Sequence, residues 1–249
     1  MTRETSQQQR EEEQRRECQH PPAHVHTLTF VLADRAPSLD QQNVEMGIYE
    51  DRLLPRMIDR LLASDDLAEL RRETCRSLDG TVLEIGFGSG LNVPHLPEAV
   101  TKVLAVDPSD VARRLAAPRI DRRGVTVDFM GRDGSSLAIE SESVDHVLCT
   151  MTLCTIPDVE AAVSEVRRVL KPGGTFSFLE HGRSPDPRVA RWQRRLTPLQ
   201  RRLFGGCHLD RDSVDLVTAG GFRLLETSAA YQRGPKIVSY FTRGLAQKP

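Results

Sequence analysis

The chain has 249 residues, 39% hydrophobic and 28% charged, which is typical of a globular protein rather than a disordered or fibrous one. Its 34 lysines and arginines balance 35 aspartates and glutamates, so no net positive field draws it to nucleic acid. No apolar run approaches the ~20 residues of a membrane-spanning helix, and the N-terminus lacks the apolar core of a secretion signal.

The number and spacing of the cysteines indicate the redox compartment and whether a metal site is present. Cys18, Cys75, Cys149, Cys154 and Cys207 are odd in number and lack the C-x-x-C spacing of zinc ligands. This pattern indicates neither a disulfide framework nor a metal site, so we predict no metal and a cytoplasmic protein.

The first 45 residues are rich in Gln, Glu and Arg and then in His and Pro. They offer too little apolar surface to offset chain entropy, so we expect a disordered tail over 1–45 and a folded domain over 46–249. The three histidines of 20–26 could bind a metal, but a solvated low-complexity tail is the simpler interpretation. Met46 stands just before a helical pattern and is a candidate natural start.

The domain is organised around residues 82–90, where a short apolar strand ends in Glu84-Ile85 and runs into the glycines of a G-x-G-x-G turn. Glycines let the backbone take positive φ angles and approach a ligand closely. We expect a helix to begin at residue 91. About twenty residues after the turn, a second apolar strand ends in Asp107, at the offset where an acid meets a ribose. The pair predicts an adenosine-type cofactor.

The remaining pattern alternates strands and helices. Two amphipathic helices are expected at 48–62, which Pro55 can kink, and at 66–78. Further helices are expected from Asp110 to just before Pro118, over 157–170 and over 213–219. Strands are expected at 124–130, 143–150, 175–180, 222–225 and 236–242. Between 184 and 211 a basic amphipathic segment contains Trp192, and Pro198 restarts its helix.

The turn 82–90, Asp107 and the Leu170-Lys171-Pro172-Gly173-Gly174 turn together resemble the motifs of class I S-adenosylmethionine-dependent methyltransferases. The resemblance implies an α/β, Rossmann-like fold with a seven-stranded, mostly parallel sheet, a C-terminal antiparallel hairpin, helices on both faces and a helical cap insertion at about 184–211. It implies S-adenosyl-L-methionine as cofactor. The positions it assigns to cofactor binding are Glu84, Gly86, Phe87, Gly88, Gly90, Asn92, Asp107, Pro108, Asp133, Gly134 and Thr150.

The second half adds the motifs C-T-x-x-L-C-T from Cys149, F-L-E-H from Phe178, W-Q at Trp192 and G-G-C-H-L-D-R from Gly205. These resemble the type-11 group, which includes small-thiol methyltransferases and ubiquinone, menaquinone and phospholipid methyltransferases. By this resemblance and by position, the expected acceptor contacts are Tyr49, Leu153, Cys154, Glu180, Trp192, Gln193 and Cys207. A thiol acceptor benefits from a base, for which His181 is the first candidate, with Asp210 or His208 second.

The sequence therefore predicts a methyltransferase acting on a small, lipophilic nucleophile such as a thiol. One alternative is a phospholipid or quinone methyltransferase whose arginine-rich segment makes weak contact with the membrane surface. An alternative of another class is a non-catalytic or NAD-binding Rossmann module, which the shortened glycine spacing disfavours. No nucleic-acid partner is expected.

Overall fold

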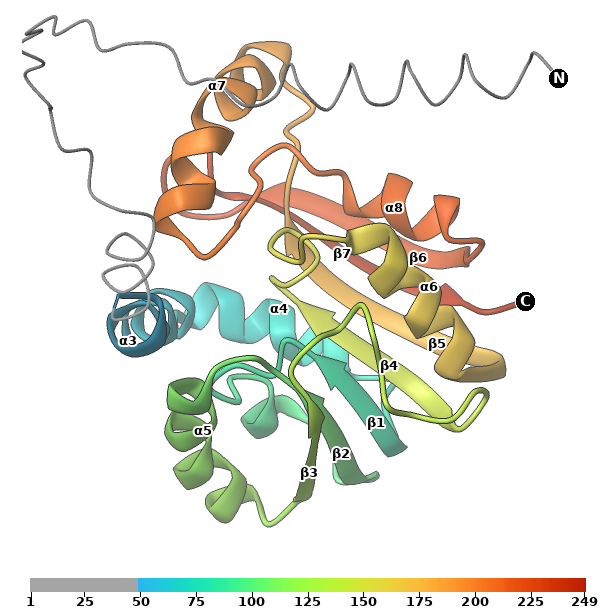
Figure 1. The fold of residues 1–249 in the computed structure, drawn as a ribbon. Coiled ribbons are helices and arrows are strands. Elements are labelled where there is room, and N and C mark those ends of the chain that lie inside the picture. Colours follow the sequence, from blue (N-terminus) through green and yellow to red (C-terminus); the bar gives the residue numbers. More distant parts are fainter. Residues whose placement is uncertain (1–48) are drawn as a thin grey trace, which may run out of the picture. The chain divides into compact units, whose positions relative to one another are not determined.

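The computed structural model describes residues 49–249 (Figure 1). The predicted tail over 1–45, its histidines and the candidate start at Met46 lie outside this part. The seven strands are β1 (Gly80–Ile85), β2 (Val100–Val106), β3 (Thr126–Gly131), β4 (Val144–Thr150), β5 (Leu170–His181), β6 (Arg223–Tyr231) and β7 (Tyr240–Gln247). They form one sheet in the order β3-β2-β1-β4-β5-β7-β6.

The direction of the strands confirms the predicted fold class. Neighbouring strands from β3 to β5 are parallel, whereas β7 pairs antiparallel with both β5 and β6. The strand order reverses between β1 and β4. In open α/β sheets, ligands bind beyond the carboxyl ends of the strands at such a switch point.

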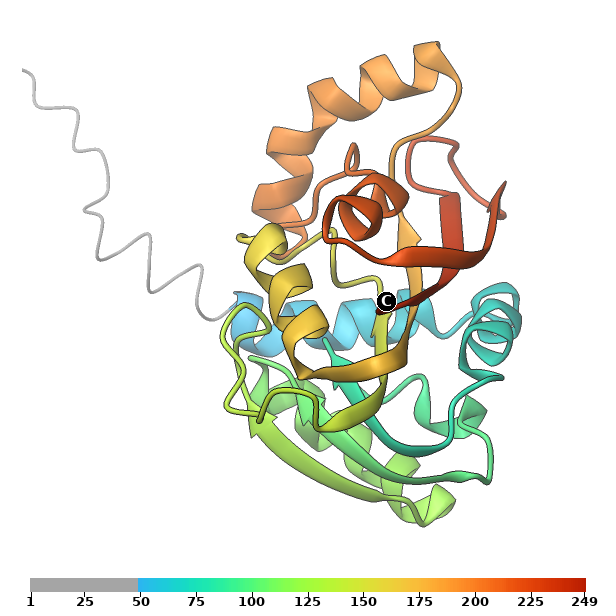
Figure 2. The same cartoon turned by 90° about the vertical axis from the view of Figure 1, so that its right-hand side faces the viewer.

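Each face of the sheet buries its own apolar cluster, because side chains alternate along a strand. Val82 and Leu148 belong to a cluster that includes residues of α4 (Asp65–Cys75) and α5 (Asp110–Arg123). Leu83 and Val147 point into the other cluster, with residues of α6 (Val159–Val169) and α8 (Ser213–Ala219). Helices thus cover both faces, as predicted (Figure 2).

Two proline predictions were wrong. Helix α5 continues through Pro118, and α7 (Pro187–Leu203) is continuous through Pro198. A proline inside a helix leaves the carbonyl four residues earlier without a donor. Here Arg114 and Arg194, which carry those carbonyls, are exposed, as are both prolines, so water can take the place of the missing donor.

Helix α5 begins at Asp110, where the sequence predicts its start. The side chain of Ser109 caps it by accepting a hydrogen bond from the Ala112 amide at 3.1 Å. Its second half is tied down by Arg119, which pairs with Asp59 at 2.9 Å and donates to the Ser89 carbonyl at 2.8 Å.

The segment after the glycine turn is not the helix expected from residue 91. Only the 3-10 turn η2 (Val93–His95) forms. Pro97 restricts the residue before it to an extended conformation, and Leu96 has φ −66° and ψ 132°. The glycine turn is therefore followed by a compact loop rather than by a long helix.

The remaining boundaries shift by a few residues. The first predicted helix is a π-helix, η1 (Tyr49–Leu53), followed by α3 (Leu54–Leu62) with Pro55 in its first turn. The second helix stops at Cys75, and β5 includes the glycine pair expected to precede it. Strand β6 extends to Tyr231, beyond its predicted end. Strand β7 begins at Tyr240, later than predicted, because residues 236–238 form a turn, and it continues to Gln247.

Helix α7 lies beyond the carboxyl ends of the strands, above the sheet in Figure 1. It falls within the segment of about 184–211 that is predicted as the helical cap insertion. Within residues 49–249, no helix combines the length and the apolar character required to cross a bilayer.

Candidate active site

The glycine turn follows β1 directly and lies at the switch point of the sheet. Gly86, Gly88 and Gly90 have φ angles of 75°, 55° and 71°, in the left-handed region that favours glycine. A Cβ at Gly86 would collide with the Thr152 side chain. At Gly88 the nearest atom to a Cβ would be the Gly86 carbonyl oxygen at 3.8 Å. The backbone at Gly88 is therefore open to a ligand, while Gly86 is packed against the segment that follows β4.

Asp107 lies beside this turn at the end of β2. One carboxylate oxygen accepts a hydrogen bond from the Gly88 amide at 2.7 Å, and the other accepts from the Ser109 amide at 2.8 Å. Burial raises the pKa of Asp107, against the lowering effect of these two bonds. Each carboxylate oxygen keeps a second lone pair, so the group can still accept hydroxyl donors.

Three predicted cofactor positions, Glu84, Asn92 and Thr150, meet in a buried network that also contains Arg71 of α4. Asn92 donates to Glu84 at 2.7 Å and to the Thr150 hydroxyl at 2.9 Å. Arg71 donates to the Asn92 amide oxygen at 2.8 Å and to Thr150 at 3.0 Å. No pattern in the sequence marks Arg71, because only the tertiary fold places α4 against the sheet.

The network leaves two polar atoms unused. Within residues 49–249, neither Glu84 Oε2 nor Arg71 Nε has a hydrogen-bond partner. Burial raises the pKa of Glu84 to about 8, although the bond from Asn92 and the nearby Arg71 act in the opposite direction. Burial likewise lowers the pKa of Arg71. An unsatisfied acceptor beneath the glycine turn suits a ligand that carries a positive group or a donor.

The other predicted cofactor residues have differing environments. Phe87 is buried and packs edge-to-face on Phe129, with ring centroids 5.6 Å apart. Gly134 packs against Ile85, and Pro108 is exposed. Asp133 is exposed and forms a turn, accepting from the Ser135 amide at 2.8 Å and from its hydroxyl at 2.6 Å. The Ser135 hydroxyl and then the amide lower the pKa of Asp133.

A cavity of about 840 Å³ lies beyond the carboxyl ends of β4 and β5. Its walls come from residues 58–67 at the α3–α4 junction, from the loop after β4, from the C-terminal part of α7 and the loop after it, and from the β6–β7 connection. Apolar side chains dominate, among them Leu62, Leu67, Met151, Phe204 and Phe241. Its volume is within the range of small-molecule sites.

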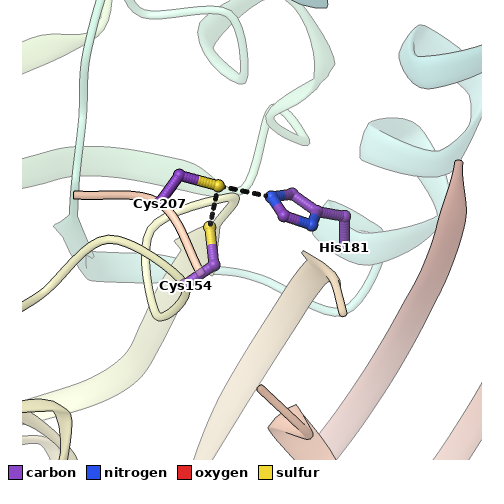
Figure 3. Close-up of side chains that lie close together, drawn as sticks. All are labelled: Cys154, His181 and Cys207. Carbon is purple, nitrogen blue, oxygen red and sulfur yellow. Dashed lines mark hydrogen bonds between the residues drawn. The ribbon is translucent and has the colours of Figure 1, made fainter. Parts of the chain in front are cut away.

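Three of the predicted acceptor-side residues line this cavity: Cys154, His181 and Cys207 (Figure 3). His181 Nε2 lies 3.0 Å from Cys207 Sγ, and the two sulfur atoms of Cys207 and Cys154 are 4.0 Å apart. The hydrogen bond with Cys154, followed by that with His181, lowers the pKa of Cys207 to about 4 despite burial. Burial opposes the charged form of His181, but its bond with Cys207 raises its pKa overall.

The other two candidate bases lie outside the cavity wall. Asp210 accepts a hydrogen bond from the Thr197 hydroxyl at 3.0 Å. The backbone amide of His208 donates to the Cys154 carbonyl at 2.8 Å, and its Nδ1 lies 3.1 Å from the same oxygen. Neither is among the residues that line the cavity.

Several predicted acceptor contacts instead hold the walls in place. Glu180 is buried and accepts from the Thr152 and Leu153 amides at 2.9 and 3.0 Å, and Leu153 is part of the apolar core. Gln193 bridges Ser184, Gly182 and Ile237. The structure places these side chains behind the cavity rather than on its surface.

The two predicted aromatic contacts are also elsewhere. Trp192 lies on α7 with 53% of its surface exposed, and Arg195 covers one face of its ring. The Tyr49 hydroxyl donates to the Leu203 carbonyl at 2.8 Å and so ties η1 to the end of α7. Neither residue lines the cavity.

The cavity is also lined by residues that are not among the predicted acceptor contacts, such as Met151, Thr155, Gln200 and Phe204. Met151 has a φ angle of 55°, unusual for a residue other than glycine, and its amide donates to the Leu179 carbonyl at 2.7 Å. These residues belong to loops and helix ends, which carry no periodic pattern.

Comparison with known proteins gives a family for the central part of this chain. Residues 83–178 match the Methyltransf_11 model, described as a methyltransferase domain. Residues 83–178 therefore resemble a methyltransferase domain. Thiol S-methyltransferase TMT1B of Rattus norvegicus is 35% identical over 53% of this chain and 56% of its own length. The demethylmenaquinone methyltransferase of Roseiflexus castenholzii is 33% identical over 51% and 55%.

A solved structure supports the fold. A SAM-dependent methyltransferase from Aquifex aeolicus superposes with a TM-score of 0.52 at 19% identity, covering 78% of this chain and 98% of that one. The chain spans little more than half the length of the two relatives above. At 19% identity, the likeness to the Aquifex aeolicus structure supports the fold alone and not a shared activity.

Proposed function

We propose that this protein is an S-adenosylmethionine-dependent methyltransferase that transfers a methyl group to a small, lipophilic thiol. The proposal depends above all on the segment 151–155. Its Thr152 side chain packs against Gly86 of the glycine turn, while Met151, Cys154 and Thr155 line the apolar cavity. One short segment is thus the common wall between a nucleoside-type site and an acceptor site.

The residues around the glycine turn fit the cofactor. Asp107 has lone pairs left for the two ribose hydroxyls, and Gly88 leaves space beside the turn. The unsatisfied Glu84 Oε2 can accept from the amino group of the methionine part. When bound, S-adenosylmethionine supplies a methyl group on a reactive sulfonium sulfur, so the chain's own task is to align the acceptor and exclude water.

The thiolate, not the thiol, is the nucleophile. Among the three candidate bases, His181 is the one that lines the cavity, and it is in contact with Cys207. We therefore assign activation of the acceptor to His181 together with Cys154 and Cys207. The apolar lining favours an alkyl or aryl thiol over a charged one. The likeness to a thiol S-methyltransferase supports the same acceptor class.

Thermal shift measurements test the cofactor assignment. A ligand at 100 times its Kd stabilises the native state by about 2.7 kcal/mol. S-adenosylhomocysteine should raise the melting temperature and NAD should not. Stabilisation by NAD alone would instead support a dinucleotide-binding module.

The acceptor is tested with radiolabelled methyl donor and a panel of alkyl thiols, hydrogen sulfide, phenols, demethylmenaquinone and phosphatidylethanolamine. We expect thiols to be methylated fastest. His181→Ala should lower the rate by about 100-fold, typical of losing the group that activates a nucleophile, without changing S-adenosylhomocysteine affinity. His208→Gln is the matched control and should retain most activity. Equal losses in both variants would contradict the assignment to His181.

A second candidate function is a phospholipid or quinone methyltransferase at a membrane surface. Its support is α7, where Trp192, Leu199 and Leu203 are 53%, 55% and 43% exposed beside several arginines. Exposed aromatic and basic side chains on one helix suit an anionic lipid surface. Co-flotation with vesicles containing phosphatidylserine, combined with turnover of a lipid acceptor, would favour this candidate over a thiol methyltransferase.

A further inference from the structure

Two cysteine sulfurs and one histidine nitrogen converge in the wall of the cavity, although they come from distant parts of the chain. Cys154 lies in the loop after β4, His181 ends β5, and Cys207 follows α7 (Figure 3). The two sulfur atoms and a ring nitrogen of His181 all lie within 4.8 Å of one another. The cysteine spacing in the sequence predicts no metal site, because these ligands are adjacent only in the folded chain.

The distances are close to those of a tetrahedral zinc site. Zn–S bonds of about 2.3 Å and Zn–N bonds of about 2.0 Å place neighbouring ligand atoms roughly 3.6 Å apart. The observed separations of 3.0 Å between His181 Nε2 and Cys207 Sγ, and 4.0 Å between the sulfurs, lie on either side of this value. Small rotations of the side chains are sufficient to equalise them.

The backbone holds each ligand in place. The Cys154 carbonyl accepts a hydrogen bond from the His208 amide at 2.8 Å, and the Cys154 amide donates to the buried Glu180 carboxylate at 3.4 Å. His181 is paired with Phe241 of β7 in the sheet. The Cys207 amide donates to the Phe204 carbonyl at 3.2 Å. Gln200 points its side-chain amide at the Cys207 sulfur from 3.8 Å, the kind of outer contact that orients a metal ligand.

All three residues line the cavity, so a bound ion would keep one coordination position directed into it. Three protein ligands with an open fourth position are the arrangement of catalytic rather than structural zinc sites. Two thiolates and an imidazole select a soft or borderline divalent ion such as Zn²⁺ over Mg²⁺ or Ca²⁺.

We propose that Cys154, His181 and Cys207 bind a zinc ion, and that the acceptor thiol binds as its fourth ligand. The inference rests on the proposed function for the identity of the acceptor. The acceptor loses its S–H proton to solvent on coordination. A sulfur lone pair then forms the new C–S bond to the methyl carbon, while the bond to the sulfonium sulfur breaks and its electrons stay on that sulfur. The neutral thioether is a weaker ligand and leaves.

The test uses the reduced full-length chain, stripped with a chelator and titrated with Co²⁺. We expect one ion per chain, the visible bands of a tetrahedral site and a near-ultraviolet thiolate-to-cobalt band, all abolished by Zn²⁺. Cys154→Ser and Cys207→Ser should each remove about half of the thiolate band and weaken binding at least tenfold. Cys75→Ala, in the buried core away from the cavity, is the matched control and should bind normally.

Two results would overturn the site: no stoichiometric binding, or a thiolate band that persists in the Cys154→Ser/Cys207→Ser double variant. The second would indicate ligands elsewhere, such as Cys18 and His20 in the N-terminal segment. S-adenosylhomocysteine affinity, measured on the same samples, reports folding and tests the proposed function separately. Chelation should lower thiol methylation at least tenfold and Zn²⁺ should restore it, whereas full activity in metal-free protein would overturn the role of the ion.

Discussion

The cofactor side and the acceptor side of the candidate site differ in chemical character. The cofactor side surrounds the glycine turn at Gly86 and consists of hydrogen-bonded polar groups. Glu84 and Asp107 lie at the ends of β1 and β2, and Asn92 follows the turn. The acceptor side is an apolar cavity with one compact group of sulfur and imidazole atoms. The first is suited to recognising a fixed nucleoside, and the second to holding a variable apolar molecule near a reactive group.

This difference between the two sides indicates which residues determine cofactor binding and which determine turnover of the acceptor. The cofactor side has directional donors and acceptors, so small changes there should cost binding. The acceptor side offers a few polar atoms within an apolar surface, so changes there should affect turnover more than cofactor affinity. Variants on the two sides should therefore separate binding from catalysis.

The largest effect on cofactor affinity is expected from Asp107→Ala. Loss of two charge-assisted hydrogen bonds, each worth about 1.5–3 kcal/mol, should weaken S-adenosylhomocysteine binding by about 100-fold or more. Asp107→Asn keeps the shape and should lose less. Isothermal titration calorimetry measures both, and an affinity within about threefold of the wild type for Asp107→Ala would exclude the ribose assignment.

The second prediction concerns how the free energy of unfolding depends on pH through Glu84. The pKa of Glu84 is about 8 in the folded protein against 4.5 for the ordinary group, so the native state binds the extra proton between these values. Stability contributed by this group is therefore present below about pH 4.5 and falls by up to about 1.4 kcal/mol per pH unit until about pH 8. Glu84→Gln should flatten the dependence of unfolding free energy on pH in urea titrations. The exposed Glu98→Gln is the control, and parallel profiles for all three proteins would contradict the assignment.

A smaller effect is expected from the glycines of the turn. Gly88→Ala puts a Cβ into open space at a φ angle of 55°, so stability should fall by only about 1 kcal/mol while cofactor affinity falls about tenfold. Gly86→Ala drives its Cβ into Thr152 and should destabilise by about 1–3 kcal/mol more. Denaturant unfolding and calorimetry on both variants measure the two losses. Intact affinity in Gly88→Ala would mean that the cofactor does not approach the turn there.

The smallest effect is expected from Trp192→Ala. The side chain is half exposed and outside the cavity, and surface substitutions typically stay within about 0.5 kcal/mol, or about twofold in rate. Steady-state kinetics with a thiol acceptor should show unchanged KM and kcat. A large increase in the KM for the thiol would instead support the contact between Trp192 and the acceptor that the sequence predicts.

Contiguous patterns determined most of the fold and the cofactor side. The apolar strands, the G-x-G-x-G turn and Asp107 at the end of the second strand each lie within a few residues of one another, and parallel strands bring their carboxyl ends to one edge. The helix limits were less predictable: Pro118 and Pro198 lie inside helices at exposed positions, where water can replace the missing backbone donor. Arg71 was missed because nothing near it in the sequence marks a buried cation.

The sequence by itself determined which segments are strands, the nucleoside-type turn and the likeness to methyltransferases, because these depend on local spacing and composition. The tertiary structure alone decided the acceptor side. It placed Trp192 and Tyr49 outside the cavity, put Glu180 and Gln193 behind its walls, and brought Cys154, His181 and Cys207 together. Residues 27 and 26 positions apart meet only when β4, β5 and the loop after α7 pack at the same edge, and no local pattern records that packing.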